Sequence, residues 1–465
     1  MTAPRHFATI PSVNTTDSNP PGSSGPGVRP NAWALLPFGV FVLFYAGLSV
    51  VARSFDAVPM AVAFSVAGAA ALAMDRGRPL VRRLESFTRG MGEPNLMLMC
   101  LIFVFAGAFA AAAKASGAVD AAVTIARTII PARFMLAGVF VVACLISLAL
   151  GTSCGTIAAL MPIAAGFAGE PPFTPGVLAG AVVGGAMFGD NLSVISDTTV
   201  AASRTLDIGM REKFIANSAL ALPAAAVVTC VYALMAGGGN LPGSATPSVA
   251  ALTARHFLLV TPYLAVFTLA VMGVDVLLLL FGGAALVAMI GMGTGAFGFF
   301  DALRHLGRGM AEMSQTMIIA LLAFGVMESV RERGGLAWIV DRMSRVARGP
   351  RTCELSVLLL VSLLNVLTAN NTLAVLLSGP MARDCADRFR IDRARLASLI
   401  DTASCVVQGF LPYGGQILIA IGVGRAAGLS LASGDVIGAL YYPPVLAAAV
   451  FASMCIRRPR HLQLQ

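Results

Sequence analysis

Charged residues are scarce in this sequence. Only 12% of its 465 residues are charged, whereas 57% are hydrophobic. A soluble globular domain carries roughly 25% charged residues, so the composition excludes an ordinary soluble fold. Apolar runs of about 20 residues recur along the whole chain, and each is long enough to cross a bilayer. We therefore predict an all-α polytopic membrane protein, placed in a bacterial inner membrane.

Histidine and cysteine offer little metal or acid–base chemistry. The four histidines, at 6, 256, 305 and 461, fall in tails or at the ends of predicted helices. The eight cysteines are scattered without zinc-like spacing, and we interpret them as small buried apolar residues. No cofactor and no resident metal are expected. An intramembrane enzyme is disfavoured as well, because the polar stretch "GTSCG" (151–155) has no mid-span His or Lys base.

The two halves of the chain share one pattern at a constant shift. Nine residues of the first half recur 218 positions later: Met99, Gly107, Gly117, Arg127, Leu145, Pro162, Ala164, Leu178 and Ala179 match Met317, Gly325, Gly335, Arg345, Leu363, Pro380, Ala382, Leu396 and Ala397. In each half, an apolar segment with a polar tip predicts a re-entrant helical hairpin, and a span with an internal polar stretch predicts a broken helix. Short amphipathic pieces at 117–130 and 335–348 precede the two hairpins.

This pattern predicts an organisation with two transmembrane repeats. It comprises a disordered tail (1–30), repeat 1 (31–236) with hairpin 134–168 and broken helix 174–203, a linker (237–249), repeat 2 (250–455) with hairpin 354–382 and broken helix 396–424, and a second tail (456–465).

Positive charge is divided unevenly between the two predicted sides of the membrane. The side that holds both termini carries 24 Lys and Arg and the other side 8, which together are the 32 of the sequence. Positive residues stay cytoplasmic during insertion, so both termini are predicted to be cytoplasmic. The net charge of +9 is then explained without nucleic acid. An odd number of crossings separates matching elements, which makes the repeats inverted, an arrangement typical of secondary transporters.

The stretch "GDNLSVISDTT" (189–199) places two carboxylates in apolar surroundings. A charged side chain near the bilayer centre costs at least about 2.5–3.5 kcal/mol, so it marks a functional candidate. We expect a midplane site that binds a cation or proton through carboxylate, amide and hydroxyl oxygens, the ligands of hard cations. One carboxylate can hold either ion, and competition between them is antiport. The candidate cation- or proton-binding residues are Asp190, Asn191, Ser193, Asp197, Thr198 and Asp401. The candidate hairpin-tip ligands are Thr152, Ser153, Thr156, Asn370, Asn371 and Thr372.

The same stretches carry a family resemblance. "GTSCGT" (151–156), "AGAVVGGAMFGDNLSVISDTTVAASR" (179–204) and "TANNT" (368–372) resemble the NhaC-type sodium/proton antiporter family of the ion-transporter superfamily. The resemblance implies Na⁺/H⁺ exchange, with sodium sites between hairpin tips and broken helices. It also implies an elevator-like movement of a hairpin domain and a homodimer. The second break, "GFLPYGGQ" (409–416), lacks a carboxylate, so two intact sodium sites are not required.

Two other functions stay open. A sodium-coupled symporter or exchanger of a small organic acid or amino acid has the same architecture, but a carboxylate substrate would favour a buried cation. No Lys or Arg is predicted well inside a span, so the sequence favours exchange of Na⁺ and H⁺. A channel is the third alternative, and closed hairpins in inverted repeats speak against it.

Overall fold

The computed structural model describes residues 29–52, 58–74, 77–169, 172–237 and 252–456. Throughout this part the chain is helical and has no β-strand. The two predicted tails and the linker lie almost wholly outside the described residues. The all-α fold expected from the composition is confirmed.

The first half of the chain forms ten α-helices after a short 3₁₀ turn at Ala32–Leu35. These are α1 (Leu36–Ala52), α2 (Met60–Met74), α3 (Leu80–Met91), α4 (Pro94–Ser116), α5 (Ala118–Ile129), α6 (Ala132–Leu150), α7 (Ser153–Gly166), α8 (Pro175–Leu192), α9 (Asp197–Leu206) and α10 (Met210–Gly237).

The second half forms eleven more among its described residues. These are α11 (Ala254–Val271), α12 (Val276–Gly293), α13 (Phe299–Glu312), α14 (Ser314–Glu332), α15 (Gly335–Ser344), α16 (Pro350–Thr368), α17 (Asn371–Phe389), α18 (Arg393–Phe410), α19 (Gly415–Ala426), α20 (Ser433–Gly438) and α21 (Tyr442–Ile456).

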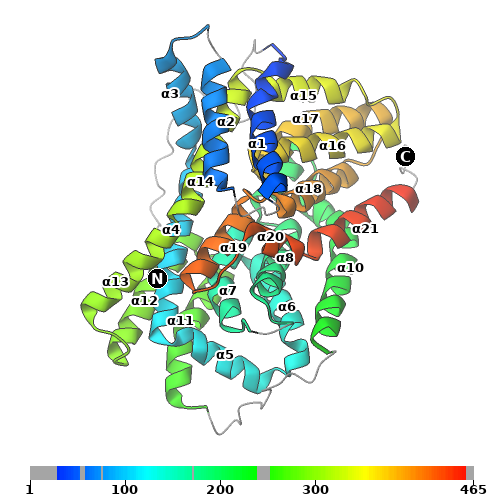
Figure 1. The fold of residues 1–465 in the computed structure, drawn as a ribbon. Helices are drawn as coiled ribbons and strands as arrows, with labels where there is room; N and C mark the ends of the chain where they lie inside the picture. Colours follow the sequence, from blue (N-terminus) through cyan, green and yellow to red (C-terminus); the bar gives the residue numbers. More distant parts are fainter. Residues whose placement is uncertain (1–28, 53–57, 75–76, 170–171, 238–251, 457–465) are drawn as a thin grey trace, which may run out of the picture.

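The helices of the two halves keep the shift of 218 residues. Adding 218 to the bounds of α6 gives 350–368, the bounds of α16, and adding it to those of α8 gives 393–410, the bounds of α18. Helices α7 and α17 start at matching positions, as do α9 and α19. In Figure 1, α1–α3 lie at the top of the molecule and α11–α13 at the lower left, as an inverted pair requires. Two inverted repeats, each with a hairpin and a broken helix, are thus confirmed as the fold class.

The hairpins turn at equivalent residues. Gly151 after α6 and Ala369 after α16 both have left-handed backbone, with φ of 67° and 49°. This conformation ends a helix by turning the chain out of its axis, and glycine adopts it without strain. The next residues, Thr152 and Asn370, are the N-caps of α7 and α17. Each hairpin therefore reverses within two residues, through one left-handed residue and the N-cap residue of its second arm.

The broken helices form the centre of the molecule. Nine helical segments in the described ranges are long and apolar enough to span a bilayer. In the two segments that contain the helix breaks, most of the apolar stretch is buried inside the protein: 83% in Pro175–Leu206 and 78% in Arg393–Ala426. In Ala32–Ala52 and in Met210–Ala236, only 28% of the apolar stretch is buried. The chain is a multi-pass membrane protein whose lipid-facing helices surround two buried, interrupted ones.

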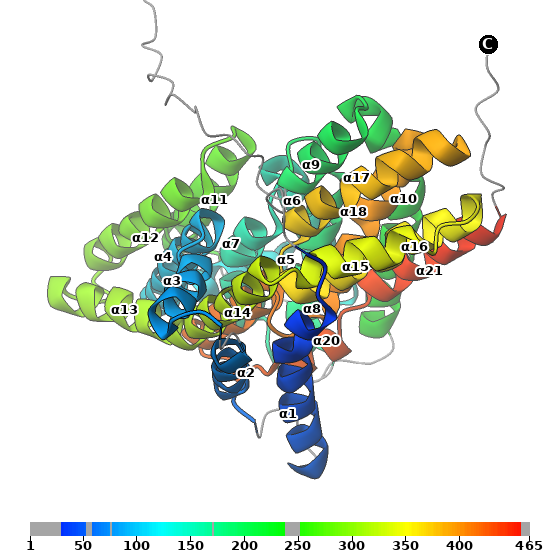
Figure 2. The ribbon, with the colours of Figure 1, turned by 90° about the horizontal axis from the view of Figure 1, so that it is seen from above.

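The two repeats pack against each other through their amphipathic helices. Helix α3 packs on α14, and α13 packs on α4, so each amphipathic helix of one repeat contacts a span of the other. In Figures 1 and 2, helices α3, α4 and α11–α14 form one side of the molecule, and α10, α16–α18 and α21 form the other. Helices α3 and α13 are not predicted from the sequence.

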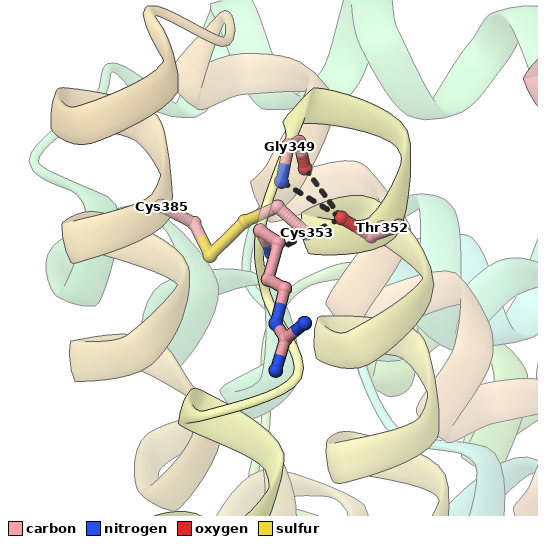
Figure 3. Close-up of a disulfide and its surroundings, with 5 residues drawn as sticks. Gly349, Thr352, Cys353 and Cys385 are labelled. Carbon is pink, nitrogen blue, oxygen red and sulfur yellow. Dashed lines mark hydrogen bonds between the residues drawn. A yellow bond between two sulfur atoms is a disulfide. The ribbon is translucent and has the colours of Figure 1, made fainter.

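The interpretation of the cysteines as small buried residues is wrong for two of the eight and incomplete for two more, which are buried but form a disulfide. Cys353 and Cys385 form a disulfide between the start of α16 and the last turns of α17 (Figure 3). Their Cα atoms lie 6.2 Å apart, so the bond joins the two arms of the second hairpin near its base. Cys230 and Cys455 are exposed. Only the remaining four fit, wholly or in part, the picture of small buried residues.

We expect Gly309→Ala to destabilise the protein. A Cβ at Gly309 would lie 2.1 Å from the carbonyl oxygen of Gly107, and the two backbones cannot separate without parting α13 from α4. Overpacking of this kind costs about 1–3 kcal/mol. Thermal unfolding in detergent measures the loss. The control is Gly307→Ala on the same helix, where a Cβ meets nothing within 4 Å and alanine favours the helix by up to about 1 kcal/mol. Equal unfolding temperatures for the two variants would contradict this close approach.

Candidate cation-binding site

The predicted break of the first central helix lies between Ser193 and Ser196. Both residues have extended backbone, one as the C-cap of α8 and the other as the N-cap of α9. Serine, asparagine and aspartate are poor helix formers because their side chains bond to nearby backbone. Here the Ser193 hydroxyl donates to the carbonyl of Leu148 in α6, 2.9 Å away. The break is therefore fixed to the first hairpin.

The carboxylate of Asp190 lies at the end of α8 and is held by two hydroxyls. Ser153, in the first turn of α7, donates to Oδ2 at 2.7 Å. Ser196, in the break, donates to Oδ1 at 2.6 Å. The hydroxyls of Ser196 and Thr198 are also 3.1 Å apart. The tip of the first hairpin and the first helix break thus converge on one carboxylate.

The second repeat reaches this carboxylate through two glutamines. Gln416 Nε2 donates to Ser153 Oγ at 2.9 Å, across 263 residues of sequence. Gln408 Nε2 donates to Gln416 Oε1 at 3.0 Å and to the carbonyl of Ala369, in the tip of the second hairpin, at 3.2 Å. We call Asp190, Ser153, Ser196, Gln416 and Gln408 the Asp190 cluster. It joins both hairpins and both broken helices.

A second polar group lies beside the first and contains a buried ion pair. Lys213 Nζ contacts the carboxylate of Asp401, and both side chains are only 1% exposed. The same ammonium donates to Thr199 Oγ1 at 2.5 Å and to the carbonyl of Asn191 at 2.9 Å. Asn217 Nδ2 donates to Asp401 Oδ2 at 3.1 Å and to both oxygens of Asn191. We call Lys213, Asp401, Thr199, Asn191 and Asn217 the Lys213 cluster.

The structure brings several predicted residues together. Asp190 and Ser153 share one cluster, Asn191 and Asp401 share the other, and Thr198 borders the first through Ser196.

Other predicted residues stay within their own turns. The Thr156 hydroxyl donates to the carbonyl of Thr152. The amide oxygens of Asn370 and Asn371 accept from the backbone of Leu373 and Thr372, as capping and turn residues do. These side chains shape the hairpin tips rather than contact either cluster.

Asp197 is separate from both clusters. It is exposed in the first turn of α9, next to the N-cap. A carboxylate there interacts favourably with the positive end of the helix dipole. Its position distinguishes it from Asp190, which lies in the same polar stretch seven residues earlier.

Lys213 corrects one conclusion drawn from the sequence. The apolar run of the sequence predicts a span over 214–236, which leaves Lys213 among the 24 charges of the cytoplasmic side. Helix α10 begins at Met210, and Lys213 is completely buried. Lys213 and Asn217 are four residues apart and share one face of this helix, which is the pattern that could have identified them. A basic residue does lie inside the molecule.

The two clusters together carry a net negative charge and contain buried oxygens without a donor. Asp190 and Asp401 carry two negative charges and Lys213 one positive charge, so the two clusters together carry a net charge of −1. Among the described residues, Gln408 Oε1 and Asn217 Oδ1 are buried without a hydrogen-bond donor. Buried oxygens of this kind are costly unless something binds them, and a hard cation prefers oxygen ligands.

Inverted repeats, buried helix breaks and a charged cluster between them define a secondary transporter. A family model described as the Na⁺/H⁺ antiporter family matches residues 30–236 and 245–452. The chain therefore belongs to the Na⁺/H⁺ antiporter family, and the resemblance seen in the sequence is confirmed.

The proteins that are similar to this chain include a curated relative and a protein of solved structure. It is 25% identical over 350 residues to a Bacillus subtilis (strain 168) protein named malate-2H(+)/Na(+)-lactate antiporter, covering 69% of this chain and 74% of that one. The crystal structure of the Alcanivorax borkumensis YdaH transporter is similar with a TM-score of 0.34 and 14% identity, covering 78% of this chain and 86% of that one.

We expect Asp401→Asn to destabilise the protein strongly, because it leaves the ammonium of Lys213 buried without a counter-charge. Breaking one side of a buried ion pair costs about 3–5 kcal/mol, whereas replacing both partners by apolar residues costs far less. Thermal unfolding should therefore show that Lys213→Met/Asp401→Leu is more stable than Asp401→Asn alone. Asp341→Asn removes an exposed pair with Arg345 and should change stability by about 1 kcal/mol or less. An unchanged unfolding temperature for Asp401→Asn would show that this ion pair is absent.

Proposed function

We propose that this chain exchanges cytoplasmic Na⁺ for external H⁺ and that Asp190 is the group for which the two ions compete. Membership of the antiporter family supports Na⁺-coupled antiport in general. The observation that carries the finer proposal is that Asp190 has no cationic partner among the described residues, whereas Asp401 is neutralised by Lys213. One uncompensated buried carboxylate fits one monovalent cation or one proton.

The surroundings of Asp190 suit both ions. Burial favours the neutral, protonated form of a carboxyl group, while a bound cation favours the charged form. The hydroxyls of Ser153 and Ser196 donate to the carboxylate and can turn their oxygens toward a cation. Either ion cancels the single negative charge, so binding of one disfavours the other. Exchange then needs only a movement that opens the site to each side in turn.

The direction of exchange rests on the orientation of the chain. Removing Lys213 from the loop charges leaves 23 Lys and Arg (24 − 1) on the side of the termini against 8 on the other. The bias persists, so we keep both termini in the cytoplasm of a bacterial inner membrane. The division into repeats 31–236 and 250–455, the elevator-like movement and the homodimer implied by the resemblance belong to the same proposal.

A second function is favoured by two observations. The Bacillus subtilis relative is named for exchange of organic acids with Na⁺ and H⁺, and Lys213 supplies a buried cation that the sequence analysis did not foresee. A small carboxylate substrate could use such an ammonium. We rank this function second because Asp401 already pairs with Lys213. Proteoliposomes loaded with labelled lactate or malate separate the two: release driven by external Na⁺ would favour the organic-acid exchanger.

We expect Asp190→Asn to abolish Na⁺/H⁺ exchange. In everted membrane vesicles, respiration acidifies the lumen, and added Na⁺ should dissipate this pH gradient through the wild-type protein. Asparagine cannot carry the charge or the proton, so the response should disappear. Asp197→Asn is the matched control, since this exposed aspartate lies in the same stretch and should leave most of the response intact.

Two outcomes would refute this assignment. Wild-type exchange by Asp190→Asn would remove this carboxylate from the mechanism. Loss of exchange in Asp197→Asn, with normal amounts of protein in the membrane, would move the ion site to the start of α9.

A further inference from the structure

The ammonium of Lys213 occupies a position lined by oxygen atoms. It contacts one carboxylate, one hydroxyl and one backbone carbonyl, which belong to Asp401, Thr199 and Asn191. These three ligands come from α18, α9 and the end of α8. No part of the ammonium is open to solvent, because the residue is completely buried.

These ligands are the ones that a hard monovalent cation takes. Carboxylate, hydroxyl and carbonyl oxygens form the sites of hard cations in proteins. The carbonyl of Asn191 is available because the residue four positions later, Ile195, lies in the helix break and cannot donate to it within a helix. Broken membrane helices typically coordinate cations through such freed carbonyls. Lys213 therefore sits where the fold presents ligands for a metal ion.

The architecture itself does not require this ion pair. Lys213 belongs to the first repeat and Asp401 to the second, and the positions 218 residues away are Leu431 (213 + 218) and Val183 (401 − 218). Both are buried apolar residues; Val183 lies in α8 as Asp401 lies in α18, whereas Leu431 precedes α20 and Lys213 lies within α10. The symmetry of the repeats therefore does not call for an ion pair here, and apolar residues of similar volume often stabilise as well.

We infer that Lys213 is a tethered cation that fills a second, latent cation site. This site consists of Asp401, Thr199 and the carbonyl of Asn191, and it would take a monovalent cation such as Na⁺ if the lysine were removed. Lys213 restricts the chain to one exchangeable cation, at Asp190. The inference goes beyond the proposed function. It rests on that function only in the choice of Na⁺ as the cation used in the test.

The test compares the thermal stability of purified full-length protein in NaCl and in choline chloride at equal ionic strength. Lys213→Ala leaves Asp401 uncompensated, so this variant should be unstable in choline and gain markedly more stability from Na⁺ than the wild type. The extra gain should vanish in Lys213→Ala/Asp401→Asn, where the carboxylate is also absent. The exposed Lys114→Ala is the matched control and should respond to Na⁺ as the wild type does.

The Asp190→Asn/Lys213→Ala variant separates the two proposals. If both proposals hold, this double variant loses the stabilisation by Na⁺ seen in the wild type. It keeps the additional stabilisation by Na⁺ that removal of Lys213 creates. Loss of the extra response in this variant would assign it to Asp190 and overturn the latent site. Should Lys213→Ala give too little folded protein, Lys213→Ser leaves similar space and is measured in the same way. A Na⁺ response no larger than that of the wild type in the lysine variant would also overturn the inference.

Discussion

Two interrupted helices at the centre of a membrane protein leave polar groups where no water can satisfy them. The structure meets this constraint by having each repeat supply partners for the other. Ser153 donates to Asp190 within the first repeat, and Gln416 of the second repeat donates to Ser153. The Asp190 cluster therefore forms only when the two halves are correctly paired. Fold and function share one requirement, because the contacts that satisfy the breaks also orient the carboxylate.

The repeats are equal in backbone and unequal in charge. The position equivalent to Asp190 is Gln408 (190 + 218), which presents an amide where the first repeat has a carboxylate. The two side chains remain connected through Gln416 and Ser153. A symmetric scaffold thus holds an asymmetric site. Only one of these two equivalent positions is charged, although the backbones around them match.

Much of the architecture was predictable from local sequence. Glycine, proline and asparagine interrupt otherwise apolar runs, so the hairpin tips and the break at Pro412 could be placed from composition and spacing. The amphipathic helices α3 and α13 were missed because their polar faces resemble connecting loops. The residues of the Lys213 cluster were only partly foreseen, since Asn217 and Asp401 meet across 184 residues. A span boundary set at residue 214 was enough to turn a buried lysine into a loop charge. The local sequence predicts the hairpin tips and the helix breaks. Which polar residues contact one another depends on tertiary packing.

The net charge of the two clusters connects these observations to transport. With Lys213 neutralising Asp401, a single negative charge remains at Asp190. A buried negative charge is unfavourable in an empty site and favourable with one cation or proton bound. A carrier that changes its accessible side only when this charge is cancelled cannot move empty, and so it must exchange one ion for another. Under the proposed function, obligatory exchange follows from the low dielectric of the interior and from the count of charges, without a separate gating device.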